Sequence, residues 1–234
     1  MIMKKFLLAT LMLFGFSTVA NSAGVNIGVT LNGGAFEVDG ASEVFSGSHV
    51  SNGSSTTVNK NADSDEAQGA FAFGSVFAEV RINDLISLGV DYVPTSLDSE
   101  TTENVQIDTG ATPSNSDDTS RTNTVAVSFE DLTTAYVMLN ATENLYIKVG
   151  LMEVEAITKE NLATGGSYGD ATLEGISAGF GYNGDLANDM FFRLEANYMD
   201  FDGAEKTNSN DANKKIKVDG ITGFGGKISV GRSF

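Results

Sequence analysis

The chain has 234 residues, a formal net charge of −17 and no cysteine. Nucleic acids and anionic membrane surfaces require clustered Lys and Arg, so we expect no nucleic-acid partner for so acidic a chain. Disulfides cannot hold the fold together, and 26 glycines beside only 2 prolines, with many small polar residues, are typical of an all-β domain.

Residues 1–23 form the first predicted element, a cleaved secretory signal. The segment has a basic start at Lys4 and Lys5, an apolar stretch over residues 6–16 and small residues at its exit. The apolar stretch is shorter than the roughly 20 residues of a membrane helix, so a retained anchor is the weaker alternative. We therefore expect a single domain over residues 24–234.

Eight segments with alternating apolar residues follow the signal. Alternation predicts strands with one apolar face each, and no later run of about 18 apolar residues predicts a membrane helix. The predicted strands cover approximately residues 25–31, 70–82, 85–93, 125–139, 145–156, 173–182, 191–201 and 218–234.

The connections between these strands alternate between short and long. Short turns are expected at residues 83–84, 140–144 and 183–185, and long polar loops at 36–68, 95–123, 158–172 and 202–217. Long loops are uncommon inside compact domains, whereas outer-membrane barrels have long external loops and short periplasmic turns. The pattern predicts an up-and-down antiparallel transmembrane β-barrel of eight strands in a bacterial-type outer membrane.

The end of the chain supports a closed sheet. Phe234 is the last residue, and Ile228 and Val230 share its parity on the last predicted strand. An unpaired terminal strand would leave an open sheet edge, so we expect this strand to pair with the first and close the barrel.

Ionisable residues gather on the face opposite to the predicted lipid-facing side chains. They are Glu79, Arg81, Asp91, Lys148, Arg193, Glu195 and Lys227, with Asp131 as a further candidate. A narrow barrel is filled by side chains rather than water, so buried charges must pair. We expect a structural ion-pair network that plugs the lumen, with an ion pathway as the alternative.

Two strands depart from this scheme. Phe71, Phe73 and Phe77 have the parity opposite to that of their apolar neighbours, which predicts a β-bulge near Gly74 or Ser75. On a later strand, Glu153 and Glu155 continue the lipid-facing parity. We expect both glutamates to lie above the hydrocarbon, where charge costs little.

The run R-L-E-A-N-Y-M-D-F-D-G, from Arg193 to Gly203, resembles the penultimate strand of OmpA-like and opacity-type small outer-membrane barrels. That family shows a pattern close to R-x-E-Y-x-Y-x-D-F-G. The resemblance implies the same barrel over the whole mature chain. It also implies that Phe234, with Val230 and Ile228, is a signal for the barrel-assembly machinery. Arg232 departs from the family, in which tyrosine or another apolar residue usually stands there.

The acidic excess lies mainly in the first two long loops. The acidic residues are Glu37, Asp39, Glu43, Asp63, Asp65 and Glu66 in the first loop, and Asp98, Glu100, Glu103, Asp108, Asp117 and Asp118 in the second. A solvated surface is the plain interpretation; weak divalent-cation binding shared with lipopolysaccharide phosphates is the alternative. No segment has the spacing of a calcium loop, so we expect no dedicated metal site and no cofactor.

The sequence favours a structural or surface-contact role over catalysis. His49 is the single histidine, and with Ser51 it is similar to the His and Ser of lipid-A-modifying barrel enzymes, but it lies in a serine-rich loop. We expect a non-enzymatic barrel whose acidic external loops contact an unknown external ligand. The alternatives are a narrow channel or a carrier of small apolar solutes, then a lipid-modifying enzyme, and last a soluble exported β-sandwich.

Overall fold

The structure, a computed structural model, describes residues 24–234 except 52–53, 62–64, 99–101, 109–118 and 163–164. The predicted signal, residues 1–23, lies outside the described residues, as do the side chains of residues 41–67 and 99–123. Among the described residues, no helix combines the length and the apolar character needed to cross a membrane.

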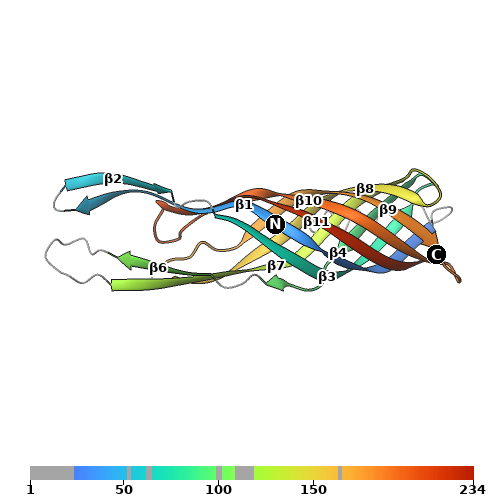
Figure 1. Ribbon diagram of the computed structural model, residues 1–234, viewed down its shortest axis with the longest axis horizontal. Helices are drawn as coiled ribbons and strands as arrows, with labels where there is room; N and C mark the ends of the chain where they lie inside the picture. Colours follow the sequence, from blue (N-terminus) through green and yellow to red (C-terminus); the bar gives the residue numbers. More distant parts are fainter. Residues whose placement is uncertain (1–23, 52–53, 62–64, 99–101, 109–118, 163–164) are drawn as a thin grey trace.

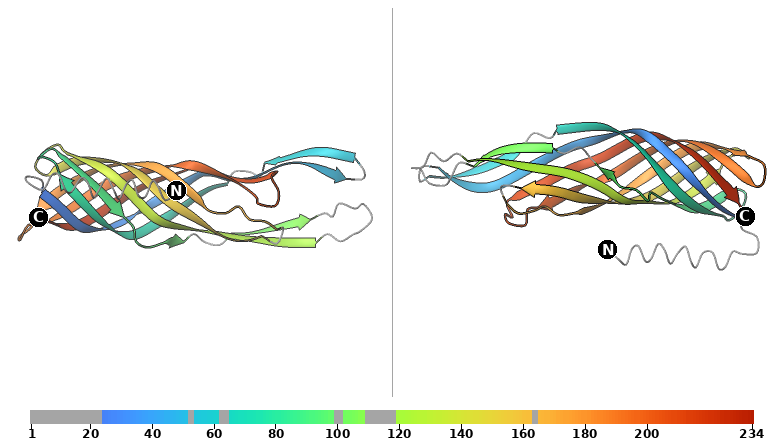
Figure 2. Two further views of the ribbon diagram at one scale, coloured as in Figure 1. Left: turned by 180° about the vertical axis from the view of Figure 1, so that it is seen from behind. Right: turned by 90° about the horizontal axis from the view of Figure 1, so that it is seen from below.

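The described residues form one antiparallel sheet that closes on itself (Figures 1 and 2). Its strands are β1 (Gly24–Ser51), β2 (Ser54–Asn61), β3 (Asp65–Arg81), β4 (Ile86–Tyr92), β5 (Leu97–Asp98), β6 (Thr102–Asp108), β7 (Thr119–Asn140), β8 (Leu145–Leu162), β9 (Ala171–Asp185), β10 (Met190–Thr207) and β11 (Lys214–Ser233). Neighbours follow the order β11-β10-β9-β8-β7-β4-β3-β1, and β11 pairs with β1. The predicted fold class, an all-β up-and-down barrel of eight strands, is confirmed.

The first and last strands close the barrel as expected. The N–H of Val25 donates to the C=O of Phe234 at 3.1 Å, and the N–H of Phe234 donates to the C=O of Val25 at 2.8 Å. From there the β1–β11 ladder runs through Val29, opposite Val230, and continues to Phe45. No edge remains at this seam.

Three short strands extend the sheet beyond the eight that form the barrel. β2 pairs with the outer part of β1, and β5 and β6 pair with β7. The β1–β2 and β6–β7 hairpins project from the end opposite to the C-terminus (Figure 1). Much of the sequence expected to be long loops is therefore strand. A hydrogen-bonded ladder does not need an apolar face, so the alternation of apolar residues ended where the apolar belt ends, not where the strands end.

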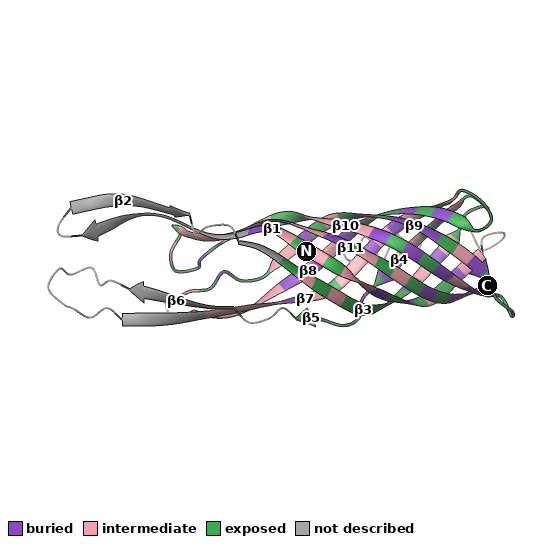
Figure 3. Cartoon of the chain, in the orientation of Figure 1, coloured by how far each residue is buried: buried purple, intermediate pink, exposed green. Residues whose placement is uncertain are grey.

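Apolar side chains cover the outer wall as a belt. The exposed fractions of Leu31, Leu151 and Phe224 are 63, 71 and 66%, and exposed and buried residues alternate along the strands (Figure 3). An apolar surface of this extent requires lipid contact. Glu153 and Glu155 follow Leu151 on the same outward parity, and their place above the hydrocarbon stays a prediction. The protein is an outer-membrane β-barrel.

The predicted bulge near Gly74 or Ser75 is wrong. The β1–β3 register runs without a shift from residue 24, opposite 81, to residue 38, opposite 67. Phe71 and Phe77 therefore point into the barrel. Glycine on the neighbouring strand makes room for them, because a Cβ on Gly28 would lie 2.5 Å from the Phe77 ring. The register shifts of the described ladders lie elsewhere, between residues 38 and 41 and between residues 130 and 133.

Candidate functional site: a two-layer lumen and a gap in the wall

Glu79 is the first centre of a polar layer in the half of the lumen near the short turns. Its carboxylate is fully buried and receives two bonds from Arg193, Nη1 to Oε2 at 2.8 Å and Nη2 to Oε1 at 2.9 Å. Asn26 Nδ2 donates to Oε1 at 2.8 Å, and the Tyr136 hydroxyl donates to Oε2 at 3.1 Å. A bidentate pair with further donors is the arrangement that makes a buried charge tolerable.

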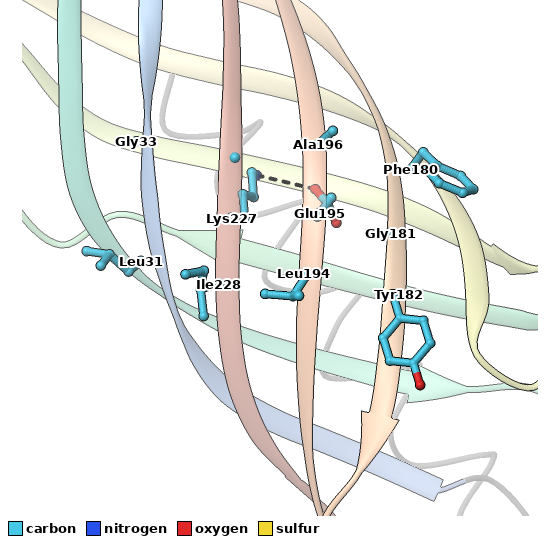
Figure 4. A pocket seen from close by; sticks show the side chains of 11 residues that line it. Leu31, Gly33, Phe180, Gly181, Tyr182, Leu194, Glu195, Ala196, Lys227 and Ile228 are labelled. Atoms are coloured by element: carbon cyan, nitrogen blue, oxygen red, sulfur yellow. Dashed lines mark ion pairs between the residues drawn. The ribbon is translucent and has the colours of Figure 1, made fainter.

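Glu195 is the second centre of this polar layer. Lys148 Nζ lies 2.5 Å from its Oε2, and the Tyr146 hydroxyl donates to the same oxygen at 3.0 Å. Lys227 Nζ lies 4.0 Å from Oε1, as the dashed line in Figure 4 marks. Two cations thus share one carboxylate.

Aromatic rings surround the Arg193 guanidinium in the polar layer. The guanidinium carbon of Arg193 lies 4.7 Å from the ring centroid of Phe191, 5.5 Å from that of Phe77 and 5.6 Å from that of Tyr146. Such cation–π contacts strengthen when water is excluded. The layer therefore blocks the lumen with paired charges and rings.

The structure brings together five of the seven residues predicted for this network: Glu79, Arg193, Lys148, Glu195 and Lys227. Asp91 also points inward and is 7% exposed, but it forms no hydrogen bond or ion pair with another described residue. Arg81 was misplaced. It is the last residue of β3, at the end of the barrel wall, so its side chain is exposed although it has the inward parity.

Sequence reasoning also missed the neutral members of the layer and misjudged one candidate. Asn26, Tyr136 and Tyr146 share the inward parity of the charges, and that parity was the available signal. Asp131 lies on the outer side, where it accepts a hydrogen bond from the Tyr92 hydroxyl. The β7 bulge turns it away from the lumen.

The external half of the lumen is apolar instead of polar. Val154, Ala156 and Leu173 form its buried centre. Around them pack Val127, Phe129, Leu132, Ala171, Phe201, Ala204 and Ile221. Two buried methionines, Met152 and Met199, also lie on the inward parity. The interior of a membrane barrel is ordinarily polar, so this apolar layer is unusual.

The wall has a gap beside the apolar layer. The β3–β4 ladder covers only residues 76–81 of β3, and within the described residues the segment 65–75 pairs with β1 alone. β4 ends at Tyr92, and Pro94 shortly after it has no N–H to donate. Residues 70 and 74 lie opposite residues 35 and 31 of β1, at the depth of the apolar belt. Unpaired backbone in hydrocarbon costs several kcal/mol per group, so this edge is an exception to normal barrel construction.

A hollow of about 520 Å³ lies on the lipid-facing wall (Figure 4). Its lining includes the apolar side chains of Leu31, Ile228 and Leu194, with Gly33 and Gly226 between them. Glu195 and Lys227 belong to the same strands but have the inward parity, so their charges lie on the lumen side of the wall. The hollow is part of the lipid-facing belt.

No protein-family model and no curated protein matches the chain. Similar solved structures include the outer membrane protein OprG from Pseudomonas aeruginosa, at 15% identity over 88% of this chain and 95% of OprG, with a TM-score of 0.44. The outer membrane protease OmpT from Escherichia coli has 8% identity over 90 and 97% of the two chains and a TM-score of 0.39. The attachment invasion locus protein Ail of Yersinia pestis has 9% identity over 88 and 98%, and a TM-score of 0.37. Because these scores are below 0.5, the fold assignment rests on the strand topology of this chain.

Proposed function

We propose that the protein lets small apolar solutes pass from outside the cell into the outer membrane. The observation that carries the proposal is the unpaired edge of β3, residues 65–75, which lies at belt depth beside the apolar layer of the lumen. A solute enters at the external mouth, moves among the apolar side chains and leaves sideways through the gap.

The polar layer makes the sideways exit the easier route. To continue toward the short-turn end, a solute would have to separate the Glu79–Arg193 pair, whose partners would then be buried without compensation. An apolar solute that leaves the apolar layer through the gap instead exchanges contacts with apolar side chains for contacts with lipid. Met152 and Met199 are unbranched and adaptable, so they can yield to it.

An uptake measurement tests this proposal. Cells that produce the protein should accumulate a labelled one-ring hydrocarbon several-fold faster than cells without it. Val154→Thr places a hydroxyl in the apolar layer at almost constant volume and should reduce uptake. Val149→Thr makes the same change on the lipid-facing side of β8 and should leave uptake unchanged. Equal uptake with and without the protein would exclude the proposed function.

The projecting hairpins favour a second candidate function, contact with an external ligand. β2 and β6 each pair with one neighbour among the described residues, so their other edges are available to an extended partner chain. The test uses a surface to which cells producing the protein attach and cells without it do not. Shortening the β6–β7 hairpin should abolish this attachment, while the barrel should still form and resist heat as in wild type. Unchanged attachment would remove this candidate.

Four finer expectations remain proposals. The resemblance of β10 to OmpA-like and opacity-type barrels supports membership of that family, and exposed Phe234, Val230 and Ile228 suit a signal for the assembly machinery. Contact of the belt with lipid supports lipopolysaccharide as a neighbour. His49 lies on β1 outside the described side chains, and we keep the proposal that the protein is not an enzyme.

A further inference from the structure

The end of β4 is fastened to β7 immediately below the gap. Tyr92 is the last β4 residue opposite β3 and also the last opposite β7. Its hydroxyl donates to Asp131 Oδ1 at 2.7 Å on the outer side of the wall. The next residue, Val93, is 2% exposed and donates its N–H to the C=O of Leu132 at 2.9 Å.

Asp131 reaches Tyr92 through an uncommon backbone conformation. Its φ is 56°, in the left-handed region, and the β7–β8 register shifts between Glu130 and Thr133. The hydroxyl of Thr133 donates to the C=O of Asp131 at 3.1 Å, which supports the turn of the chain there. Aspartate tolerates this region better than most residues, but the conformation still costs free energy and must be held by its surroundings. A bulge of this kind re-aims a side chain, and here it directs a carboxylate to the tyrosine.

We propose that the Tyr92–Asp131 hydrogen bond is a latch that fixes the width of the gap and so limits the size of solute that leaves through it. The size limit rests on the proposed function; the control of the gap width does not. β3 forms one side of the gap and is held by β1. The other side is the chain after β4, which is attached to β7 by the latch, by the Val93 hydrogen bond and, further along, by the two-residue β5–β7 ladder. The latch is a side-chain attachment at the very end of β4, so its loss frees the part of that side nearest to the β3–β4 ladder.

Distance measurements across the gap test the latch directly. The chain has no cysteine, so Ala72→Cys on exposed β3 and Thr95→Cys beyond β4 can carry a unique pair of spin labels. In the Tyr92→Phe background the distance distribution should broaden and shift to longer values. Tyr182→Phe, an exposed tyrosine on β9 far from the gap in strand order, should leave it unchanged. An identical distribution in wild type and Tyr92→Phe would overturn the latch.

Asp131 variants separate the hydrogen bond from the backbone. Asp131→Asn keeps an acceptor oxygen and tolerance of positive φ, so it should behave as wild type. Asp131→Ala removes the acceptor and should widen the distribution as Tyr92→Phe does, which gives a second variant if either fails to fold. An Asp131→Asn distribution as wide as that of Asp131→Ala would contradict a role for the hydrogen bond.

Uptake distinguishes failure of the latch from failure of the proposed function. With a correct latch, Tyr92→Phe raises uptake of a three-ring hydrocarbon relative to a one-ring hydrocarbon several-fold. If the gap is wider in Tyr92→Phe but no variant, nor wild type, takes up either hydrocarbon, the transport function and the size limit are excluded. The control of the gap width by the latch then still stands. A different result is that wild type takes up the hydrocarbons while Tyr92→Phe changes neither the gap width nor the ratio of three-ring to one-ring uptake. That result would exclude the latch and leave the transport function standing.

Discussion

Individual residues of the polar layer are fitted to one another. A Cβ on Gly181 would clash with the ring of Tyr146, whose hydroxyl binds Glu195. We predict that Gly181→Ala displaces this ring and destabilises the barrel by about 1–3 kcal/mol. Urea titration in lipid vesicles, followed by gel mobility without boiling, measures the change. Gly226→Ala is the control, since its nearest neighbour would be Glu195 O at 3.7 Å and we expect almost no effect.

The Glu79–Arg193 pair makes a second prediction at the scale of residues. Glu79→Gln removes the charge that compensates Arg193 and should cost about 3–5 kcal/mol, as for other broken buried pairs. The double variant with Arg193→Met leaves no unpaired charge and should be more stable than Glu79→Gln alone. The same unfolding titration checks both. If the free energy of unfolding falls in the double variant by the sum of its losses in the two single variants, the two side chains do not act as a pair.

At the scale of elements, the unpaired edge of β3 should be visible in hydrogen exchange. Alternate amides of residues 70–75 point away from β1 and have no partner on β4, whereas residues 76–81 have partners on both sides. We predict that these alternate amides exchange faster than those of residues 76–81. Uniform protection along β3 would mean that the edge is covered. Amides of β9, which pairs on both sides over most of its length, provide the fully protected reference.

The sequence predicted the elements well where one face of a strand was apolar. Alternation identified Ile147 and Leu151 as outward and Lys148 as inward because the two faces of β8 differ there. It failed on Phe71, because phenylalanine looks the same to the pattern whether it faces lipid or lumen. The apolar layer around Leu173 was hidden for the same reason. The gap depends on which residues of β3 and β4 pair, and the alternation within a strand contains no information about its partner.

For the whole molecule, the two lumen layers predict a barrel that does not conduct ions. The polar layer closes the lumen with compensated charges and rings, and the apolar layer excludes the water that an ion would need. Planar bilayers containing the purified protein should therefore remain silent. Combining Glu79→Ala with Arg193→Ala empties the centre of the polar layer but leaves the apolar layer intact, so it should also remain silent. If this double variant conducts while wild type does not, the polar layer alone forms the seal, and the apolar layer must admit water as well as apolar solutes.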